Sequence, residues 1–338
     1  MDGNGRYVLN TDLSYLDSKI DPRNSVKNYT RLTASARLDG KWLWNERNIH
    51  WNLSTDYTGS FDDAKRDKDA TVEEDSYKSD FSSFKMAGKW NLKFSNHSWI
   101  REIHAATSVS WQWEKMRETK SVSLNRPAAI ATQTETGESD GIYLPYNYVA
   151  QMEIDGKPLY VTVSARTHLA FPLGGLQNRM NLGVEWNYQK NLGKGQVFDV
   201  TRPISEGLST RPRRFKDIPG LQPFAFYAEE VLNLPVNKHK LAFTAGIRLQ
   251  SLLGLDRKYE MQGKIYPDLR LDLQWSLPTS KGWNIAFSGG LGWISRMPTT
   301  AQLYPDFKYV DLIQLTYYHN NPDYRRINMM TYKWDNTN

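Results

Sequence analysis

The chain of 338 residues contains no cysteine. The absence of thiols excludes disulfide bonds, thiol catalysis and thiolate metal sites. The chain also lacks any run of about eighteen consecutive apolar residues, the length that a membrane-spanning helix requires. The sequence therefore predicts no transmembrane helix and no cysteine-based site.

The chain also has only a small excess of positive over negative charge. The 43 Lys and Arg residues exceed the 37 Asp and Glu residues by only six. The bases alternate along the chain, as in Lys85, Lys89 and Lys93, whereas a nucleic-acid reader gathers them on one face. We therefore expect no nucleic-acid partner. The negative mean hydropathy of −0.65 does not exclude a membrane barrel, because half of its strand residues face a polar interior.

Strict alternation of apolar and polar residues is the main feature that the chain does have. Leu269, Leu271 and Leu273 share one face of a predicted strand, while Asp272 and Gln274 share the other. A run of about ten such residues, tilted by about 40°, spans the hydrocarbon layer of an outer membrane. The clearest predicted strands are Ile49–Tyr57, Phe84–Phe94, Arg179–Gln189, Phe224–Leu234, Leu241–Leu249 and Leu269–Leu277.

About eleven strands are predicted, and the links between them are alternately long and short. The short links are Asn45–Asn48, Ser95–Arg101, Pro172–Asn178, Pro235–His239 and Pro278–Gly282. The long links are Ser18–Asn28, Ser60–Ser79, Met116–Gly156, Asn191–Gly220 and Ser251–Lys264. This alternation is typical of a transmembrane β-barrel, which has short turns at the periplasmic rim and long loops outside. The predicted topology starts at Tyr7 on the periplasmic side and places the loops around Tyr146 and Arg213 outside.

Tryptophans on the apolar faces favour the same interpretation over a soluble antiparallel sheet, which also alternates. Indole rings prefer the headgroup level and form girdles at both rims of a barrel. The tryptophans placed on apolar faces are Trp42, Trp51, Trp90, Trp111, Trp113, Trp186, Trp275, Trp283 and Trp293. Glu230 shares the apolar face of its strand, so we expect it near a rim or at a bulge that turns it inward.

The regular succession of alternating strands and links ends at about Arg296. The residues between Pro298 and Pro305 predict a turn with one helical turn, and part of Phe307–Asn338 is expected to extend strands above the membrane. Residues Ser295–Pro305 resemble the R-x-P-x-x-x-x-L-Y-P stretch of TonB-dependent outer-membrane receptors of the Bacteroidota type. The residues that match it are Arg296, Pro298, Leu303, Tyr304 and Pro305.

Two further segments are similar to the same family. Ala245–Arg248 matches its recurrent strand motif after a Phe226–Glu230 strand, and Asn321–Tyr324 matches the segment before its later strands. The resemblance implies that the chain is the wall and extracellular loops of a receptor that imports a scarce nutrient across the Gram-negative outer membrane. It implies lipid, lipopolysaccharide and TonB as partners, with a surface lipoprotein as a further candidate.

The chain departs from this family in extent. Residues 1–338 predict about half of the 22 strands that the family has, with no plug, no TonB-contact segment and no aromatic terminal strand. No secretory signal is visible near Met1 either. Open strand edges are not tolerated in lipid, so we expect a partial or open barrel, either an excerpt or one piece of a split barrel. TonB would then act through the missing plug region.

No catalytic, cofactor or metal motif stands out, and we expect the chain not to be an enzyme. The six histidines are scattered, and a lumen-lining role is favoured for His50, His104 and His168. Ligand contacts are expected in the outer loops, which are the usual place for binding residues. The candidates there are Tyr143, Tyr146, Tyr148, Arg211, Arg213 and Arg214.

Two alternatives remain open at this point. One is an outer-membrane barrel that is not coupled to TonB, such as a porin or an adhesion or assembly component. The other, less favoured, is a barrel enzyme of the lipase type. Such an enzyme needs a serine and a histidine from adjacent strands on the same face, oriented by a third group.

Overall fold

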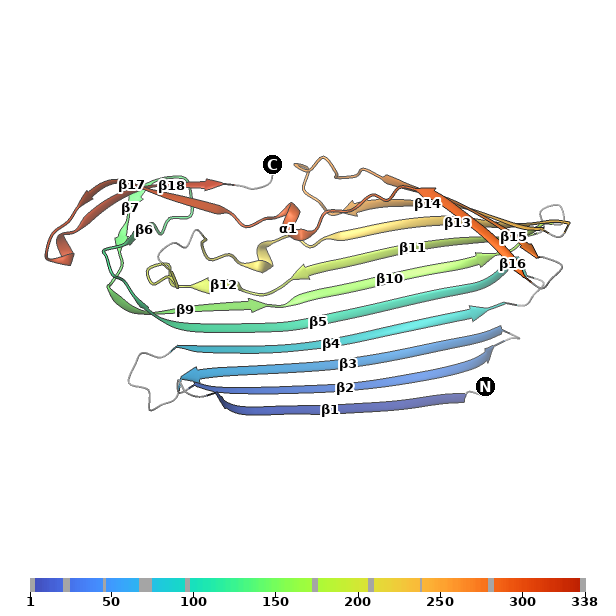
Figure 1. Ribbon diagram of the computed structural model, residues 1–338, viewed down its shortest axis with the longest axis horizontal. Coiled ribbons are helices and arrows are strands. Elements are labelled where there is room, and N and C mark those ends of the chain that lie inside the picture. The colour runs from blue at the N-terminus through green and yellow to red at the C-terminus, as the bar shows by residue number, and fades with distance from the viewer. Residues whose placement is uncertain are drawn as a thin grey trace.

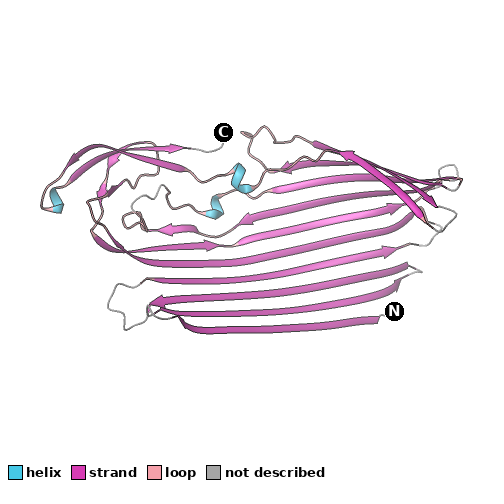
Figure 2. Cartoon of the chain, viewed as in Figure 1, coloured by secondary structure: helices cyan, strands magenta, loops and turns pink. Residues whose placement is uncertain are grey.

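A computed structural model describes residues 4–20, 25–44, 47–66, 75–94, 98–171, 176–205, 210–237, 239–278 and 283–334. Strands dominate this part of the chain, and the helical segments within it are single short turns (Figure 2). None of its helices is long and apolar enough to cross a membrane.

The described residues form a 13-stranded sheet in which every pairing is antiparallel (Figure 1). Eleven strands follow one another along its main path, in the order β1-β2-β3-β4-β5-β10-β11-β13-β14-β15-β16. Their bounds are β1 Asn4–Ile20, β2 Ser25–Trp44, β3 Arg47–Arg66, β4 Ser76–Lys93, β5 Ile100–Ser123, β10 Pro158–Leu169, β11 Gln177–Asn191, β13 Gln222–Val236, β14 His239–Leu253, β15 Tyr266–Pro278 and β16 Asn284–Gly292. Two further strands, β9 (Asn147–Gly156) and β12 (Gly195–Phe198), pair beside this path at the long-loop end.

The register keeps the alternation in phase from strand to strand. Leu271 of β15 lies opposite Ala245 of β14, and Leu273 lies opposite Phe243. Because directly paired residues of an antiparallel sheet point to the same side, one face stays apolar and the other polar. A slip of one residue would exchange the two faces, so the sequence pattern fixes the register.

All of the predicted strands and their approximate number are confirmed. The predicted long links are too long in three places. β1 and β2 leave only residues 21–24 between them, and β3 ends at Arg66 while β4 begins at Ser76. Inside the predicted link Met116–Gly156, residues 116–123 of β5 pair with β9. The polar ends of these strands continue to pair, since backbone hydrogen bonds persist where apolar alternation stops. Parts of the predicted short links, residues 45–46, 95–97, 172–175, 238 and 279–282, lie outside the described residues.

The sheet is open. Within the described ranges β1 pairs only with β2, and β16 pairs only with β15. The sheet curves, with β13–β16 bending over toward one side, as Figure 1 shows. The prediction of an all-β, antiparallel, partial or open architecture is therefore confirmed.

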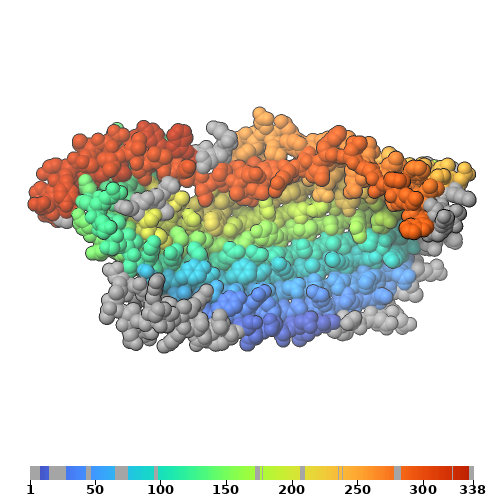
Figure 3. All heavy atoms as spheres, in the orientation of Figure 1, coloured from blue at the N-terminus to red at the C-terminus, as the bar shows by residue number. Residues whose placement is uncertain are grey.

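A second, smaller layer covers the end of the sheet where the long loops lie (Figures 1 and 3). Strands β17 (Lys308–Tyr317) and β18 (Arg326–Trp334) form a hairpin, and β18 also pairs with β7 (Gly137–Asp140). The short strands β6 (Ala129–Ile130) and β8 (Ile142–Tyr143) pair beside it. Strands are thus present after Phe307, as expected, but they form a separate sheet instead of extending the strands of the main one.

The single helical turn expected between Pro298 and Pro305 is also confirmed as α1 (Thr300–Leu303). The Thr299 backbone N–H donates to the Gln302 side chain at 2.8 Å, which closes the start of this turn. Two short 3₁₀ turns complete the fold, η1 (Phe215–Asp217) and η2 (Pro322–Tyr324).

Buried apolar clusters occur at the long-loop end. One contains Val122, Leu144, Tyr148 and Ala150. The others contain Leu221, Leu252, Leu255 and Leu303, and Ala131, Ile327 and Met329. The long-loop end therefore has a packed core of its own, while the transmembrane-length part of the sheet is a single layer.

Glu230 places a carboxylate on the apolar face of the sheet. It pairs with Met180 and Ala245 in an unbroken register, so the alternative of a bulge is wrong. It lies six positions before Val236, the last residue of β13, toward the short-turn end. In the ladder Glu230 lies beside Ala245 and, across β14, Leu271, so the expectation of a position near a rim stays a prediction.

Candidate functional site

The apolar face of the sheet is exposed instead of being covered by another layer. The side chains of Leu271, Leu273 and Trp275 on β15 are 45%, 51% and 40% exposed. The same holds along neighbouring strands for Phe84, Met86, Trp90, Ile103, Trp111, Val163, Val184, Phe224, Phe226, Ile247, Ile285 and Phe287. Contiguous apolar surface on this scale marks a contact surface for a membrane or for another protein.

The tryptophans on this face lie at two levels. Trp90 pairs with Ala105 of β5, and Trp111 lies six positions further along the same strand. At about 3.3 Å per residue the two levels are about 20 Å apart along the strand. Trp51 and Trp275 belong to the level near the short turns, and Trp186 and Trp293 to the level near the long loops. The order of the two levels is that of aromatic girdles, but on a strand tilted by about 40° the span covers about 15 Å of depth, less than the roughly 25 Å band of an outer-membrane barrel.

The opposite face carries a network of polar contacts. Thr162 donates to Asn187 at 2.7 Å, and Asn187 donates to Glu185 at 2.8 Å. Glu185 also forms an ion pair with Arg248 at 3.2 Å. Such a network satisfies the polar groups of a face that meets water.

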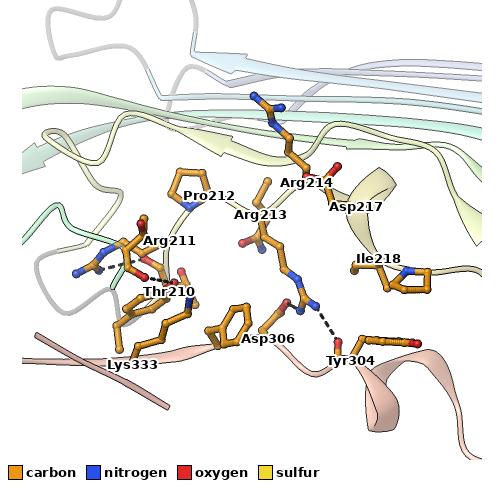
Figure 4. Close-up of a pocket in the computed structure, with 15 residues that line it drawn as sticks. Thr210, Arg211, Pro212, Arg213, Arg214, Asp217, Ile218, Tyr304, Asp306 and Lys333 are labelled. Atoms are coloured by element: carbon orange, nitrogen blue, oxygen red, sulfur yellow. Dashed lines mark hydrogen bonds and ion pairs between the residues drawn. The ribbon is translucent and has the colours of Figure 1, made fainter. Parts of the chain in front are cut away.

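A pocket lies at the long-loop end, between two segments that are far apart in the sequence (Figure 4). One wall is the loop Thr210–Pro219, and the other is the segment Tyr304–Tyr309 that follows α1. Lys333 of β18 contributes from a third segment, and the cavity measures about 500 Å³. This volume is within the range of small-ligand sites.

Arg211 is buried and fastens the two walls. Its guanidinium donates to both carboxylate oxygens of Asp311, at 3.0 and 2.9 Å, and to the Gln133 carbonyl oxygen at 3.2 Å. The guanidinium also stacks over the Tyr309 ring, 4.8 Å from its centroid. Thr331 donates to Asp311 from the far side, at 2.7 Å. The donors of Arg211, which the sequence assigned to a ligand, therefore already have partners within the protein.

The guanidinium of Arg213 holds the second wall by contacting the backbone of that wall. It donates to the carbonyl oxygens of Pro305, at 2.7 Å, and Tyr304, at 3.0 Å, and pairs with the Asp306 carboxylate (Figure 4). Lys333 pairs with Glu135 at 2.8 Å and lies over the Phe307 ring. Three cations therefore brace the pocket instead of standing free within it.

Arg214 differs from its neighbours. It is exposed, and Figure 4 shows it pointing away from the Arg213 contacts. A guanidinium in this position offers a fork of donors that suits a carboxylate or phosphate. Of the three arginines predicted to contact ligand, Arg214 is the one whose geometry leaves it accessible, and the prediction of ligand contact stays a prediction.

The three predicted tyrosines are placed in different surroundings. Tyr148 is buried, and its hydroxyl donates to the Pro203 carbonyl oxygen at 2.8 Å. Tyr143 packs edge-on against Tyr318, with 6.4 Å between ring centroids. Tyr146 is 44% exposed. Tyr146 is therefore the tyrosine available to stack on a bound group, while the other two support the outer layer.

The family-motif residues form part of the core beneath this pocket. Leu303 is buried with Leu221 and Leu252, and Pro298 and Pro305 are half-buried around α1. Tyr304 packs edge-on against Tyr259 at 5.6 Å. Burial raises the pKa of the Tyr304 phenol, and nearby Tyr259 and Asp256 raise it further, so the hydroxyl stays neutral. Arg296 is exposed.

Sequence reasoning missed Asp311, Thr331, Tyr309 and Lys333 as members of the site. Asp311 lies 100 residues after its partner Arg211. No local spacing connects such residues, because the pairing depends on how the outer layer docks. An isolated acid on an apolar strand such as β17 is the single signal that could have suggested a buried partner.

No family model matches the chain, and no curated protein matches it. Among solved structures the chain is similar to the translocator domain of autotransporter NalP from Neisseria meningitidis, at 11% sequence identity and a TM-score of 0.25. The similarity covers 86% of this chain and 87% of that chain. A TM-score at this level does not establish a shared fold, so the functional argument depends on the chain's own residues.

Proposed function

We propose that the chain is wall and outer loops of a β-barrel in the outer membrane of a Gram-negative cell. The observation that carries this proposal is the exposed apolar face, bounded by two levels of tryptophan, on a sheet with a polar opposite face. In water that face would drive aggregation. In a bilayer it meets acyl chains, and the paired strands satisfy the backbone groups that lipid cannot.

The direction of insertion follows from the two ends of the sheet. The packed outer layer lies at the end with long connections, and short links join the strands at the other end (Figure 1). Outer-membrane barrels have short periplasmic turns and long extracellular loops. We therefore place the Arg214 pocket outside the cell and Val236 on the periplasmic side.

The finer proposal is a TonB-dependent receptor that takes up a scarce nutrient. Its support is the motif resemblance around Arg296–Pro305, together with a braced pocket of ligand size in the outer layer. A non-coupled outer-membrane barrel fits the exposed apolar face equally well. That the chain is not an enzyme stays an expectation from the sequence.

Separation of membranes from cells that make the protein tests the location. We expect the protein in the dense fraction that contains lipopolysaccharide. Recovery in the cytosol or the inner membrane would contradict the proposal.

Conductance across a planar lipid bilayer separates the two finer alternatives without any knowledge of the ligand. A plugged receptor, purified at full length from the outer membrane, is expected to keep the bilayer closed at low voltage. A porin-type barrel gives steady open-channel steps, and that result would replace the receptor proposal with the non-coupled one.

A further inference from the structure

Two histidines and a glutamate meet on the polar face of the sheet, near the short-turn end. Glu102 and His104 are two positions apart on β5 and so point to the same side. His168 of β10 lies directly opposite Glu102 in the register. The outer layer and its pocket are at the far end of the sheet, so this cluster is separate from the site described above.

The three side chains present their ligand atoms to one point. Glu102 Oε2 lies 3.0 Å from His104 Nε2 and 3.9 Å from His168 Nε2. All three atoms lie within 4.8 Å of one another. Ligand atoms that share a tetrahedral zinc ion, at about 2.0–2.1 Å from it, are roughly 3.3 Å apart. Small side-chain rotations therefore suffice to bring all three onto one ion.

Neighbouring residues fix which nitrogen of His168 is available. Asn181 donates its amide N–H to the Glu229 carboxylate at 2.9 Å, so its oxygen is the atom that faces His168. Arg179 also donates to this oxygen, at 3.2 Å. The oxygen accepts the N–H of His168 Nδ1. In the neutral imidazole the lone pair is then on Nε2, the nitrogen that points toward Glu102.

This arrangement is the one that protein metal sites use. A ligating histidine usually donates its other ring N–H to an oxygen that orients the ring, as Asn181 does here. Without a cation, the lone pair of His168 and the carboxylate of Glu102 face each other as two acceptors. The side chains of the three residues are 17–23% exposed, which leaves an approach for an ion from the polar face.

We propose that Glu102, His104 and His168 bind a divalent transition-metal ion, with zinc as the reference ion. Two imidazole nitrogens and one carboxylate suit zinc and its neighbours, whereas magnesium and calcium prefer oxygen ligands alone. Three protein ligands leave a coordination position for water. Asn181 is the positioning residue. The proposal depends on the pairing of β5, β10, β11 and β13 and not on what the barrel transports.

Titration of the folded full chain in detergent micelles tests this site, with Co²⁺ as the optical probe and Zn²⁺ as the competitor. We expect one ion per chain, visible d–d absorption for Co²⁺, and its loss when Zn²⁺ is added. Glu102→Gln, His104→Ala and His168→Ala should each abolish the stoichiometric signal. The matched control is His239→Ala, at the same end of the sheet but outside the cluster, which should bind as the unchanged chain does.

Two further variants test how the cluster is organised. Asn181→Leu should weaken Zn²⁺ binding by about 10–100-fold and change the Co²⁺ spectrum, since the ring of His168 loses its orienting oxygen. Lys93 lies opposite Glu102 in the register, so Lys93→Ala removes a competing cation and should strengthen binding. Circular dichroism confirms that each variant keeps its strand content.

Two results would overturn the proposal. One is the absence of stoichiometric Co²⁺ or Zn²⁺ binding by the folded, unchanged chain. The other is binding that the three ligand variants and His239→Ala alter to the same extent, because the ion would then sit elsewhere.

Discussion

At the scale of single residues, position along a strand decides which medium a side chain meets. Leu271 and Leu273 point to the exposed apolar face, while Asp272, between them, points to the polar face. The carboxylate of Asp272 is within 2.6 Å of the guanidinium of Arg270 on that polar face. Exposure of this kind is unfavourable in water and favourable in lipid, so the residue pattern itself indicates the solvent.

A charge introduced on either face of β15 measures this difference. Leu271→Arg should lower the free energy of unfolding by about 2–4 kcal/mol, because it places a cation at mid-depth in lipid. Gln274→Arg places the same side chain on the polar face and should cost much less. Urea unfolding in lipid vesicles gives both values, and equal costs would contradict the assignment of faces.

The buried pair of Arg211 and Asp311 predicts a second residue-scale effect. Arg211→Leu leaves the Asp311 carboxylate without its cation and should loosen the β17–β18 layer by about 3–5 kcal/mol. Hydrogen exchange of β18 amides measures that loss. Arg211→Leu combined with Asp311→Leu should recover part of it, and exposed Arg214→Leu should leave exchange unchanged. Full protection in Arg211→Leu would show that the pair does not hold this layer.

At the scale of elements, the first five strands extend well beyond the length of about ten residues that crosses a membrane. β5 has 24 residues, and its distal half pairs with β4 and β9. Arg117 on this half contacts Glu153 of β9 at 2.8 Å, and Lys115 contacts it at 3.3 Å. The hydrogen bond from Arg117 is the main reason that the pKa of Glu153 is lowered from its ordinary value of 4.5.

This lowered pKa predicts acid sensitivity of the β5–β9 extension. The stabilisation by ionised Glu153 is fully present above pH 4.5 and is lost as the pH falls through the lower pKa of the folded state. Hydrogen exchange of β9 amides should therefore accelerate in acid beyond its intrinsic pH dependence. Glu153→Gln should remove that extra acceleration, and an unchanged acid response in this variant would assign it to other groups.

The element scale also shows what the sequence could predict. The alternation predicts the strands and their two faces, because apolar residues mark one face of each strand and polar residues mark the other. The lengths of the links are harder to predict from the sequence. Residues 18–28 are as polar as a loop, yet all of them except residues 21–24 lie in paired strands. Polar strand extensions and polar loops have the same composition, and only long-range pairing separates them.

At the scale of the whole molecule, an open curved sheet carries a separately packed layer at one end (Figures 1 and 3). The sequence predicts the sheet from local pattern and strands within Phe307–Asn338, but it does not predict β6, β7 and β8, which lie in the predicted loop Met116–Gly156. It does not predict the docking of that layer, since Arg211 and Asp311, or Tyr309 and the Thr134 carbonyl oxygen, meet across more than 90 residues. The candidate site was therefore only partly predictable.

Orientation in the outer membrane is the central claim, and the absence of cysteine allows a direct test with single reporters. Arg214→Cys marks the outer layer, and Val236→Cys marks the short-turn end; both positions are exposed. A bulky, membrane-impermeant maleimide should label Arg214→Cys in intact cells and Val236→Cys only after the outer membrane is permeabilised. Labelling of Val236→Cys in intact cells, with Arg214→Cys protected, would contradict this account.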